Sequence, residues 1–213
     1  MAFGRTLFER AVERQDVTYD DISVGEFLDA IASERVAPAG GTATAITGAT
    51  GAALCEMVCT HTVAAADSEA DADGFDQESL PALRARLHRR RQTLLALGEQ
   101  DAGLVEEVFG DGEAPSARLQ RRAAGIPLAV SEAALGVVTD AETVHRRGRD
   151  GVAADARTGA YLADAAVRAS LETLRINVGA LSDRSFAADL EDRAADIERS
   201  AATVRGRLFG VDE

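Results

Sequence analysis

Apolar residues recur along this chain at intervals of three and four, which is the spacing of amphipathic helices. The spacing is clearest in residues 79–109, 117–146 and 152–181, and in a final segment that Ser182 is expected to cap. The stripe in residues 79–109 consists of Leu80, Leu83, Leu87, Leu94, Val105 and Val108. No segment of strand length alternates with a period of two. The pattern predicts an all-α protein and, because the breaks are short, an antiparallel helical bundle.

Two shorter patterns precede these segments. Ser23-Val-Gly-Glu26 is a capping box at the start of a short amphipathic helix. Pro38 to Gly41 then predicts a turn, after which Thr42 is expected to be the N-cap of a helix of small residues that runs to about Ala66. The small residues leave a narrow surface that another backbone can approach closely. A helix that begins on a glycine turn also presents unpaired N–H groups, which suit an anionic ligand.

The remaining segments complete a single domain over residues 1–213. Residues 1–20 predict a short helix, and residues 1–21 are interpreted as an extension that docks on the body or on a partner subunit. Residues 69–74 resemble the first half of a calcium loop, but Leu80 occupies the position where a bidentate Glu is required, so we interpret residues 67–78 as solvated surface. Pro127 predicts a kink or a restart within residues 117–146.

The composition is strongly acidic. The sequence contains 36 Asp and Glu against 23 Lys and Arg, a formal net charge of −13, and every residue of the latter group is arginine. A lysine-free, acidic, alanine-rich chain suggests a halophilic source, since salt screens the repulsion between surface carboxylates. The same charge argues against nucleic acid as a partner, because no segment forms a basic face.

The location expected for the protein is the cytoplasm. No apolar run approaches the roughly 18–20 residues of a membrane helix, and the N-terminal residues lack the apolar core and cleavage site of a signal peptide. The two cysteines, Cys55 and Cys59, lie four residues apart on one predicted helix, where they do not bridge easily. Unbridged thiols fit a reducing compartment.

Asp101 is the unusual residue of the long stripe. Its helical spacing from Leu94, Val105 and Val108 places a carboxylate on the buried face of the helix. A buried carboxylate requires a partner or a chemical function, and no helix end accounts for this one.

An ordered set of passages over roughly residues 22–190 resembles the cyclodeaminase/cyclohydrolase family, whose members act on tetrahydrofolate one-carbon derivatives. The passages are Ser23 to Ser33, Pro38-Ala-Gly-Gly-Thr42, Gly51 to Val58, Asp101-Ala-Gly-Leu-Val, Ile126-Pro-Leu-Ala-Val, Ala154-Asp155 and Leu174-Arg-Ile-Asn177. The chain departs from the family loop at Ala39, where glycine is usual, and at Thr42, where serine is usual. It also has His61-Thr-Val-Ala-Ala where a Tyr-Gly-Lys-like stretch is usual.

The resemblance implies a site for a cationic folate with an anionic tail. Such a site needs a carboxylate near the cation, a base or positioned water, and donors for the tail. Asp101 and Asp155 are the candidate catalytic residues. The candidate substrate-binding residues are Pro38, Gly40, Gly41, Thr42, Arg149, Arg175 and Asn177. Arginine suits the tail because it binds carboxylates through two parallel hydrogen bonds. No cofactor and no metal are expected.

Several of these residues also suit a purely structural role. Asp155 lies in the first turn of its predicted helix, where acids are favoured by the helix dipole. Arg175 and Asn177 equally suit pairing with acids between subunits. Cys55, Cys59 and His61 are too few for a zinc site, and His61 lies off the cysteines' face. Neither His88 nor His145 has a nucleophile beside it in the sequence, so nucleophilic catalysis has no support.

Two functions of different kinds remain open. The first is an enzyme, a methenyltetrahydrofolate cyclohydrolase or a formiminotetrahydrofolate cyclodeaminase, which the sequence does not separate. The second is a helical scaffold of the same fold that binds folate or a partner protein without catalysis, which Ala39 and the missing Tyr-Gly-Lys-like stretch motivate. Small-residue and leucine faces, together with the resemblance, predict a homodimer with folate sites near the subunit boundary.

Overall fold

A computed structural model describes Tyr19 and residues 21–66, 79–109 and 115–210. In this part of the chain every regular element is a helix, which confirms the all-α prediction. The helices are α2 (Val24–Ile31), α3 (Gly40–Ala66), α4 (Leu80–Phe109), α5 (Ala117–Arg147), α6 (Ala153–Gly179) and α7 (Arg184–Phe209). The helix expected in residues 1–20 and the acidic loop of residues 67–78 lie outside the described residues, apart from Tyr19.

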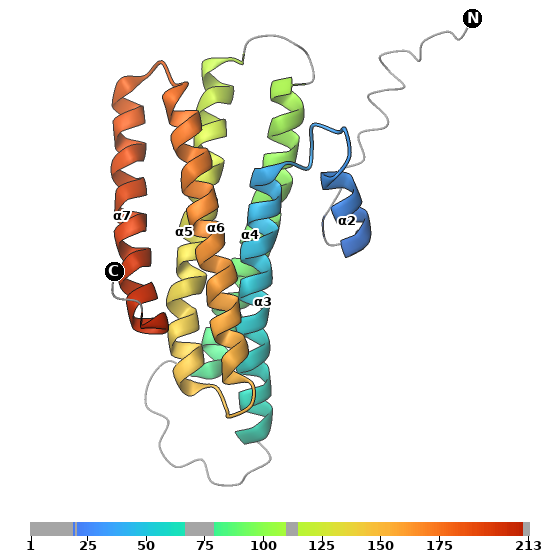
Figure 1. Cartoon of the computed structure of the whole chain (residues 1–213), viewed down its shortest axis with the longest axis vertical. Coiled ribbons are helices and arrows are strands. Elements are labelled where there is room, and N and C mark those ends of the chain that lie inside the picture. The colour runs from blue at the N-terminus through green and yellow to red at the C-terminus, as the bar shows by residue number, and fades with distance from the viewer. Residues whose placement is uncertain (1–18, 20, 67–78, 110–114, 211–213) are drawn as a thin grey trace, which may run out of the picture.

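Helices α3 to α7 form an antiparallel bundle (Figure 1). The chain runs down α3, up α4, down α5, up α6 and down α7, as the short breaks in the sequence predicted. The most extensive contacts are between α5 and α6, α3 and α4, and α3 and α6, whereas α7 packs on α5 and α6. The short helix α2 stands beside the N-terminal end of α3 and buries none of its own residues.

The close packing expected of the small-residue helix occurs between α3 and α6. A Cβ added to Gly51 would lie 2.5 Å from the carbonyl oxygen of Gly159, and one added to Gly159 would lie 2.6 Å from the carbonyl oxygen of Gly51. The two backbones therefore touch, and neither position has room for alanine. The buried thiol of Cys55 continues this contact toward the carbonyl oxygen of Ala156, 3.8 Å away. These pairs fix the antiparallel register of α3 and α6.

Two predicted helix caps differ in the structure. Helix α3 begins at Gly40, so Thr42 lies inside its first turn and is not the N-cap. Helix α7 is capped by Asp183 and not by Ser182, since the Asp183 carboxylate accepts a 3.1 Å hydrogen bond from the Phe186 N–H. Neighbouring residues of similar capping strength produced the second error. The capping box of Ser23 and Glu26 at the start of α2 is confirmed.

Helix α5 continues through Pro127 without a restart. By length and composition alone it is the one helix in the described residues with an 18-residue window apolar enough to cross a membrane. Charged residues such as Glu132 interrupt its apolar run, which is why the sequence pattern did not reveal it. Since 56% of that window is buried in the bundle, packing as a core helix accounts for its apolar character.

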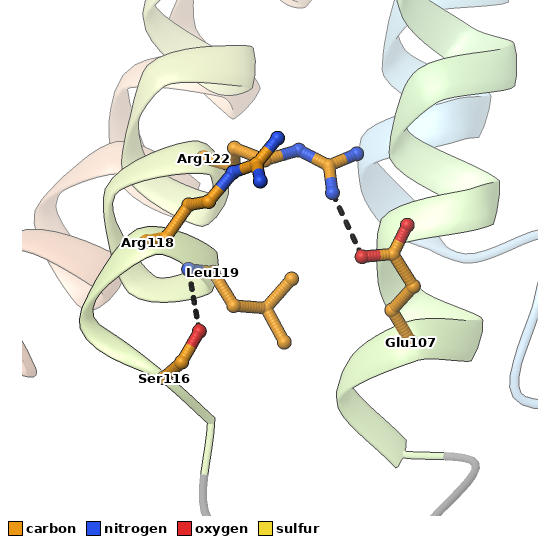
Figure 2. Close-up of a pocket in the computed structure, with 5 residues that line it drawn as sticks. All are labelled: Glu107, Ser116, Arg118, Leu119 and Arg122. Carbon is orange, nitrogen blue, oxygen red and sulfur yellow. Dashed lines mark hydrogen bonds and ion pairs between the residues drawn. The ribbon is translucent and has the colours of Figure 1, made fainter.

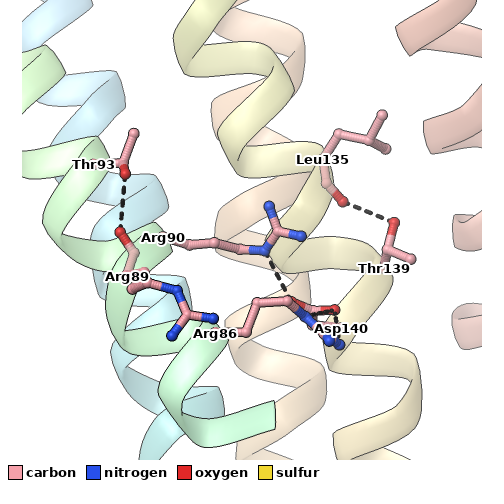
Figure 3. A network of polar contacts seen from close by, with 7 residues as sticks. All are labelled: Arg86, Arg89, Arg90, Thr93, Leu135, Thr139 and Asp140. Carbon is pink, nitrogen blue, oxygen red and sulfur yellow. Dashed lines mark hydrogen bonds and ion pairs between the residues drawn. The ribbon is translucent and has the colours of Figure 1, made fainter. Parts of the chain in front are cut away.

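A second buried carboxylate, Asp140, joins α5 to α4 (Figure 3). Its oxygens accept hydrogen bonds from the Nε atoms of Arg86, at 3.0 and 3.1 Å, and of Arg90, at 2.9 Å. Gly136 leaves the space for this arrangement, because a Cβ there would overlap the Arg90 guanidinium. Asp140 is only 5% exposed, and the two arginines supply the charge that makes its burial tolerable.

Candidate functional site

A buried polar pair lies at the N-terminal end of α3. The Thr42 hydroxyl donates a 2.8 Å hydrogen bond to Oδ2 of Asp101 on α4. Thr42 is fully buried and Asp101 is 6% exposed, as the position of Asp101 on the apolar stripe predicted. Burial raises the pKa of Asp101, while hydrogen bonds from the side chain and backbone of Thr42 partly lower it. The carboxylate therefore also serves the exposed N–H end of α3, the role that a capping residue would otherwise fill.

Gly41 makes room for this carboxylate. A Cβ added to Gly41 would lie 2.3 Å from Oδ1 of Asp101, so no larger residue fits without displacing it. A Cβ on the neighbouring Gly40 would meet nothing within 4 Å. The two glycines of the predicted loop thus differ: Gly41 is needed for close approach, and Gly40 is open. The preceding Pro38 follows a cis peptide bond and is half-buried beside this end of α3.

Tyr19 belongs to the same end of the bundle. Its backbone N–H donates a 3.3 Å hydrogen bond to Oε1 of Glu99, two residues before Asp101 on α4. Its ring meets the ring of Phe27 edge-on, with 5.3 Å between centroids. Burial raises the pKa of the Tyr19 phenol, and the charges of Asp101, Glu106 and Glu99 act in the same direction. Sequence reasoning missed Tyr19 because it lies in the extension, outside any helical stripe.

Asp155 and Arg149 lie far from this pair within the chain. The residue after Asp155, Ala156, lies level with Cys55, and the helix from Thr42 to Cys55 is about 20 Å long at 1.5 Å per residue. The Arg149 N–H donates a 3.1 Å hydrogen bond to the Thr62 hydroxyl, about 30 Å along α3 from Thr42. The structure therefore does not bring the two predicted carboxylates to one substrate atom within a single chain.

Arg175 and Asn177 lie near the C-terminal end of α6 and have partners. The Arg175 guanidinium donates to Glu172, at 3.0 Å, and to Glu198 of α7, at 2.7 Å. The Asn177 side-chain amide donates a 2.6 Å hydrogen bond to the carbonyl oxygen of Ala123 on α5. That carbonyl is the one that Pro127, four residues later, cannot bond, because proline has no N–H. Asn177 thus satisfies a backbone group that the proline leaves unpaired.

A pocket of about 400 Å³ opens between α4 and α5 at the same end of the bundle as Asp101 (Figure 2). It is lined by Glu107, Ser116, Arg118, Leu119 and Arg122. Arg118 and Arg122 are one helical turn apart on the same face of α5, and Arg122 donates a 2.7 Å hydrogen bond to Glu107. Two guanidinium groups beside the first turn of a helix favour an anionic group. Their arginine-rich sequence was the only signal of this site, and it was not recognised.

Neither the two cysteine thiols nor a metal site is a good candidate for the chemistry of this protein. Burial raises the pKa of Cys55 to about 12 and that of Cys59 to about 11, which leaves both thiols protonated and unreactive at neutral pH. Among the residues that the structure describes, no group of three or more His, Cys, Asp or Glu side chains is arranged to hold a metal ion. The chemistry that the arrangement offers is that of one buried carboxylate held by a hydroxyl, with cationic groups nearby.

Fold and site together define a class of protein. It is an antiparallel helical bundle with an acidic site at the N-terminal end of a glycine-rich helix. The model of the formiminotransferase-cyclodeaminase family matches residues 23–196, and the chain belongs to that family. The resemblance seen in the sequence is thereby confirmed.

Two relatives extend the comparison. The chain is 30% identical over 190 residues to a methenyltetrahydrofolate cyclohydrolase of Methylorubrum extorquens, a match that covers 83% of this chain and 87% of the relative. The fold of this chain is similar to that in the crystal structure of formiminotetrahydrofolate cyclodeaminase from Thermotoga maritima, with a TM-score of 0.80 and 22% identity. That match covers 90% of this chain and 96% of the other, and it supports the helical fold.

Proposed function

We propose that the protein is an enzyme of tetrahydrofolate one-carbon interconversion and that its reaction is that of a methenyltetrahydrofolate cyclohydrolase. The observation that carries the proposal is the buried Asp101 carboxylate, held by Thr42 within a family whose relative at 30% identity is a cyclohydrolase. Formiminotetrahydrofolate cyclodeaminase activity is the alternative reaction, which the same carboxylate would serve. In either case the protein would act on folates, as the sequence predicted.

The cyclohydrolase reaction has a simple requirement. The methenyl carbon between N5 and N10 of the substrate shares a positive charge, and water adds to it with loss of a proton. Breakage of the bond between that carbon and N5 then leaves a formyl group on N10. A carboxylate stabilises the cation and takes the proton of the attacking water. Asp101 is suited to both tasks, since burial raises its pKa and therefore makes the ionised carboxylate a stronger base.

The anionic tail of the substrate requires donors at the same end of the bundle. Arg118 and Arg122 supply them in this proposal, because the pocket they line lies on the Asp101 side of the molecule. Glu107 lies six residues after Asp101 on α4, which is about 9 Å along the helix axis. Arg149 lies at the other end of the bundle, and Arg175 already binds two carboxylates.

We also propose that the protein is a homodimer, that it is located in the cytoplasm, and that it comes from a halophilic organism. Exposed apolar side chains on and after α2 support the homodimer: Val24 is 76% exposed, Leu28 56% and Val36 51%. The unbridged cysteines and the net charge of −13 support the other two proposals. No cofactor and no metal take part in the reaction as proposed.

The test is an assay of both substrates at high salt with the full chain. We expect the absorbance of methenyltetrahydrofolate to fall faster with the protein than in buffer alone. We expect ammonia to be released from the formimino compound more slowly than methenyltetrahydrofolate is hydrolysed. If the formimino compound reacted faster than methenyltetrahydrofolate, the protein would be a cyclodeaminase. Binding of a folate analogue without turnover of either substrate would support the helical scaffold, and neither binding nor turnover would reject the folate proposal.

A further inference from the structure

We propose that two copies of this chain meet through the outer face of α3 and α6. This face, called the α3/α6 face below, consists of Thr50, Leu54 and Met57 on α3 and of Leu162, Ala165 and Ala169 on α6. The inference rests on the proposed homodimer and gives it an interface. It does not depend on which folate reaction the protein catalyses.

Helix α3 has no charged side to present to water. Glu56 is its only charged residue, and the Glu56 carboxylate is turned toward α4, where it accepts a 3.0 Å hydrogen bond from Nε of Arg91. A helix without a polar side is typical of one that is buried all round. Yet Thr50 is exposed, and Leu54 and Met57 are only half-buried. One side of α3 is therefore uncharged and uncovered in the single chain.

The direction of that side follows from the contacts of α3. Gly51 faces α6, because a Cβ there would lie 2.5 Å from a carbonyl oxygen of that helix. Glu56 faces α4. Thr50, Leu54 and Met57 recur at intervals of four and three, so they share the remaining side, which faces away from the bundle. The Thr50 hydroxyl donates to a carbonyl oxygen of its own helix, which leaves it without need of water.

Helix α6 continues the same surface, because its charged side chains turn toward α7. Asp164 accepts a 3.2 Å hydrogen bond from Arg205, and Arg175 donates one of 2.7 Å to Glu198. On the other flank, Ala163 lies against the backbone contact with α3. The three residues that α6 contributes to the α3/α6 face lie between these two flanks, and none of them is charged.

The size of the surface fits a stable dimer. Helices α3 and α6 have 27 residues each, about 40 Å, and two adjacent helices are about 20 Å wide. Such a surface offers about 800 Å², the share of one partner in a standard interface. Helix α2, with 8 residues or about 12 Å, is too short to supply this area alone. It stands beside the N-terminal end of α3, so its exposed apolar side chains lie at the edge of the same interface (Figure 1).

The charge of the chain favours a second copy as the partner. With a net charge of −13, two copies repel each other through their acidic surfaces. The repulsion is smallest where both copies contribute a face without charge, and the α3/α6 face meets that condition. An anionic lipid surface repels the same net charge, so the charge disfavours a membrane as the partner.

The shape of the face is also self-complementary. Leu54 and Met57 project from α3, whereas Ala165 and Ala169 leave space on α6. A two-fold axis places α3 of each chain against α6 of the other, and every contact then occurs twice. The large side chains of one chain thereby fill the space beside the small side chains of its partner.

The first test is Thr50→Glu. Because Thr50 is exposed in the single chain, we expect the helical content by circular dichroism to be unchanged. At the interface the new carboxylate loses its water, a cost that salt does not screen, so the dissociation constant of the dimer should rise at least about 100-fold. Light scattering at molar salt measures the mass. Thr93→Glu is the matched control, since Thr93 is exposed on α4 and, like Thr50, donates to the carbonyl oxygen four residues earlier.

The second test repeats the change on α6. Ala165→Glu adds a carboxylate to the α6 part of the face, and Ala188→Glu adds one at an exposed position on α7. We expect Ala165→Glu to give the mass of a monomer and Ala188→Glu to keep the mass of the dimer. The same result on both helices would assign the interface to the α3/α6 face and not to one helix end.

The possible failures are distinguishable. A dimeric wild-type protein whose Thr50→Glu and Ala165→Glu variants stay dimeric would overturn the α3/α6 face, while the homodimer would stand. A monomeric wild-type protein would overturn both. If that monomer bound phosphatidylcholine vesicles and Thr50→Glu released it, the face would meet a membrane and the second copy would be rejected. Turnover of the wild-type protein tests the proposed reaction separately, because the mass of the protein is measured without substrate.

Discussion

The hydroxyl of Thr42 on α3 donates a hydrogen bond of 2.8 Å to Oδ2 of Asp101 on α4. The two residues are 59 positions apart in the sequence, and both are buried. The contact gives Asp101 two roles that are usually separate. It serves the N–H end of α3 as a cap does, and it presents a carboxylate whose pKa is raised by burial. The first role concerns stability and the second concerns chemistry, so one variant distinguishes them.

That variant is Asp101→Asn. The amide oxygen still accepts from Thr42, so we expect the fold to persist, while loss of a general base lowers turnover about 10²- to 10⁴-fold. Because the folded pKa of Asp101 is raised, its protonation stabilises the fold fully at pH values below the unfolded pKa. That stabilisation is lost as the pH rises through the folded pKa. The variant should lack this pH dependence of the melting temperature. Thermal unfolding over a pH series and turnover on the same samples test both expectations.

Asp155→Asn is the companion variant. The Asp155 carboxylate lies about 20 Å from Asp101 along the bundle, so we expect the variant to turn over substrate at close to the wild-type rate. Loss of turnover in Asp155→Asn would mean that a second chain completes the site. A destabilised but fully active Asp101→Asn would instead make Asp101 a structural residue only.

The two glycines of the α3 turn predict opposite outcomes. Gly41→Ala places a methyl group 2.3 Å from a buried carboxylate oxygen, so we expect a loss of about 1–3 kcal/mol in the free energy of unfolding and a lower turnover. Gly40→Ala meets nothing within 4 Å and should leave both quantities unchanged. Chemical denaturation of the two variants provides the comparison. Equal effects would show that the turn needs glycine flexibility and not space.

Helical periodicity predicted much of this structure because it depends only on local sequence. Each long helix, the antiparallel bundle and the burial of Asp101 follow from apolar spacing. The role of Thr42 does not. A threonine after a glycine turn is a good N-cap by type, and only the three-dimensional fold shows that a carboxylate from α4 occupies that position.

The site residues that were predicted from residue type and motif lie at different positions along the bundle. Which end of the molecule a residue occupies depends on the up-and-down order of the helices and on their register. Arg149 follows α5 and therefore lies at the opposite end from Gly40. Arg118, which was not singled out, begins the same helix and lies at the Asp101 end. The sequence identified arginine as the residue type, and topology determined which arginines are near.

Arg118→Ala tests the proposed tail site. Loss of a cationic contact to a carboxylate that is bound equally in substrate and transition state should raise KM about 10-fold and leave kcat unchanged. Steady-state kinetics at a fixed salt concentration measure the split. Arg89→Ala is the matched control, since it removes the same charge from an exposed position on α4 at a distance from the pocket. If both variants raised KM equally, the effect would come from the general positive charge of the protein and not from a tail site at Arg118.

Leu28→Glu tests the proposed homodimer. Leu28 is 56% exposed on a helix that buries none of its own residues, so a charge there should separate chains that meet through α2. Light scattering at molar salt is the measurement, because the Debye length is then about 3 Å and repulsion between acidic chains is screened. Gln92→Glu adds the same charge on the exposed face of α4 and should leave the mass unchanged. A monomeric wild-type protein under these conditions would contradict the homodimer itself.

Asn177 and Pro127 predict a coupling that neither residue shows alone. Asn177→Ala removes the donor to the partly buried Ala123 carbonyl, and an acceptor left without a partner there costs at most about 1–3 kcal/mol. Pro127→Ala restores a backbone N–H that bonds the same carbonyl within α5. In the Pro127→Ala background, therefore, Asn177→Ala should cost much less. Any effect of removing proline on the unfolded chain is the same with Asn177 and with Ala at position 177, so a double-mutant cycle by chemical denaturation isolates the coupling. Additive costs would show that Asn177 does not compensate for the proline. Turnover per folded molecule completes the test: a wild-type value in Asn177→Ala assigns the residue to the fold, and a large loss assigns it to the substrate.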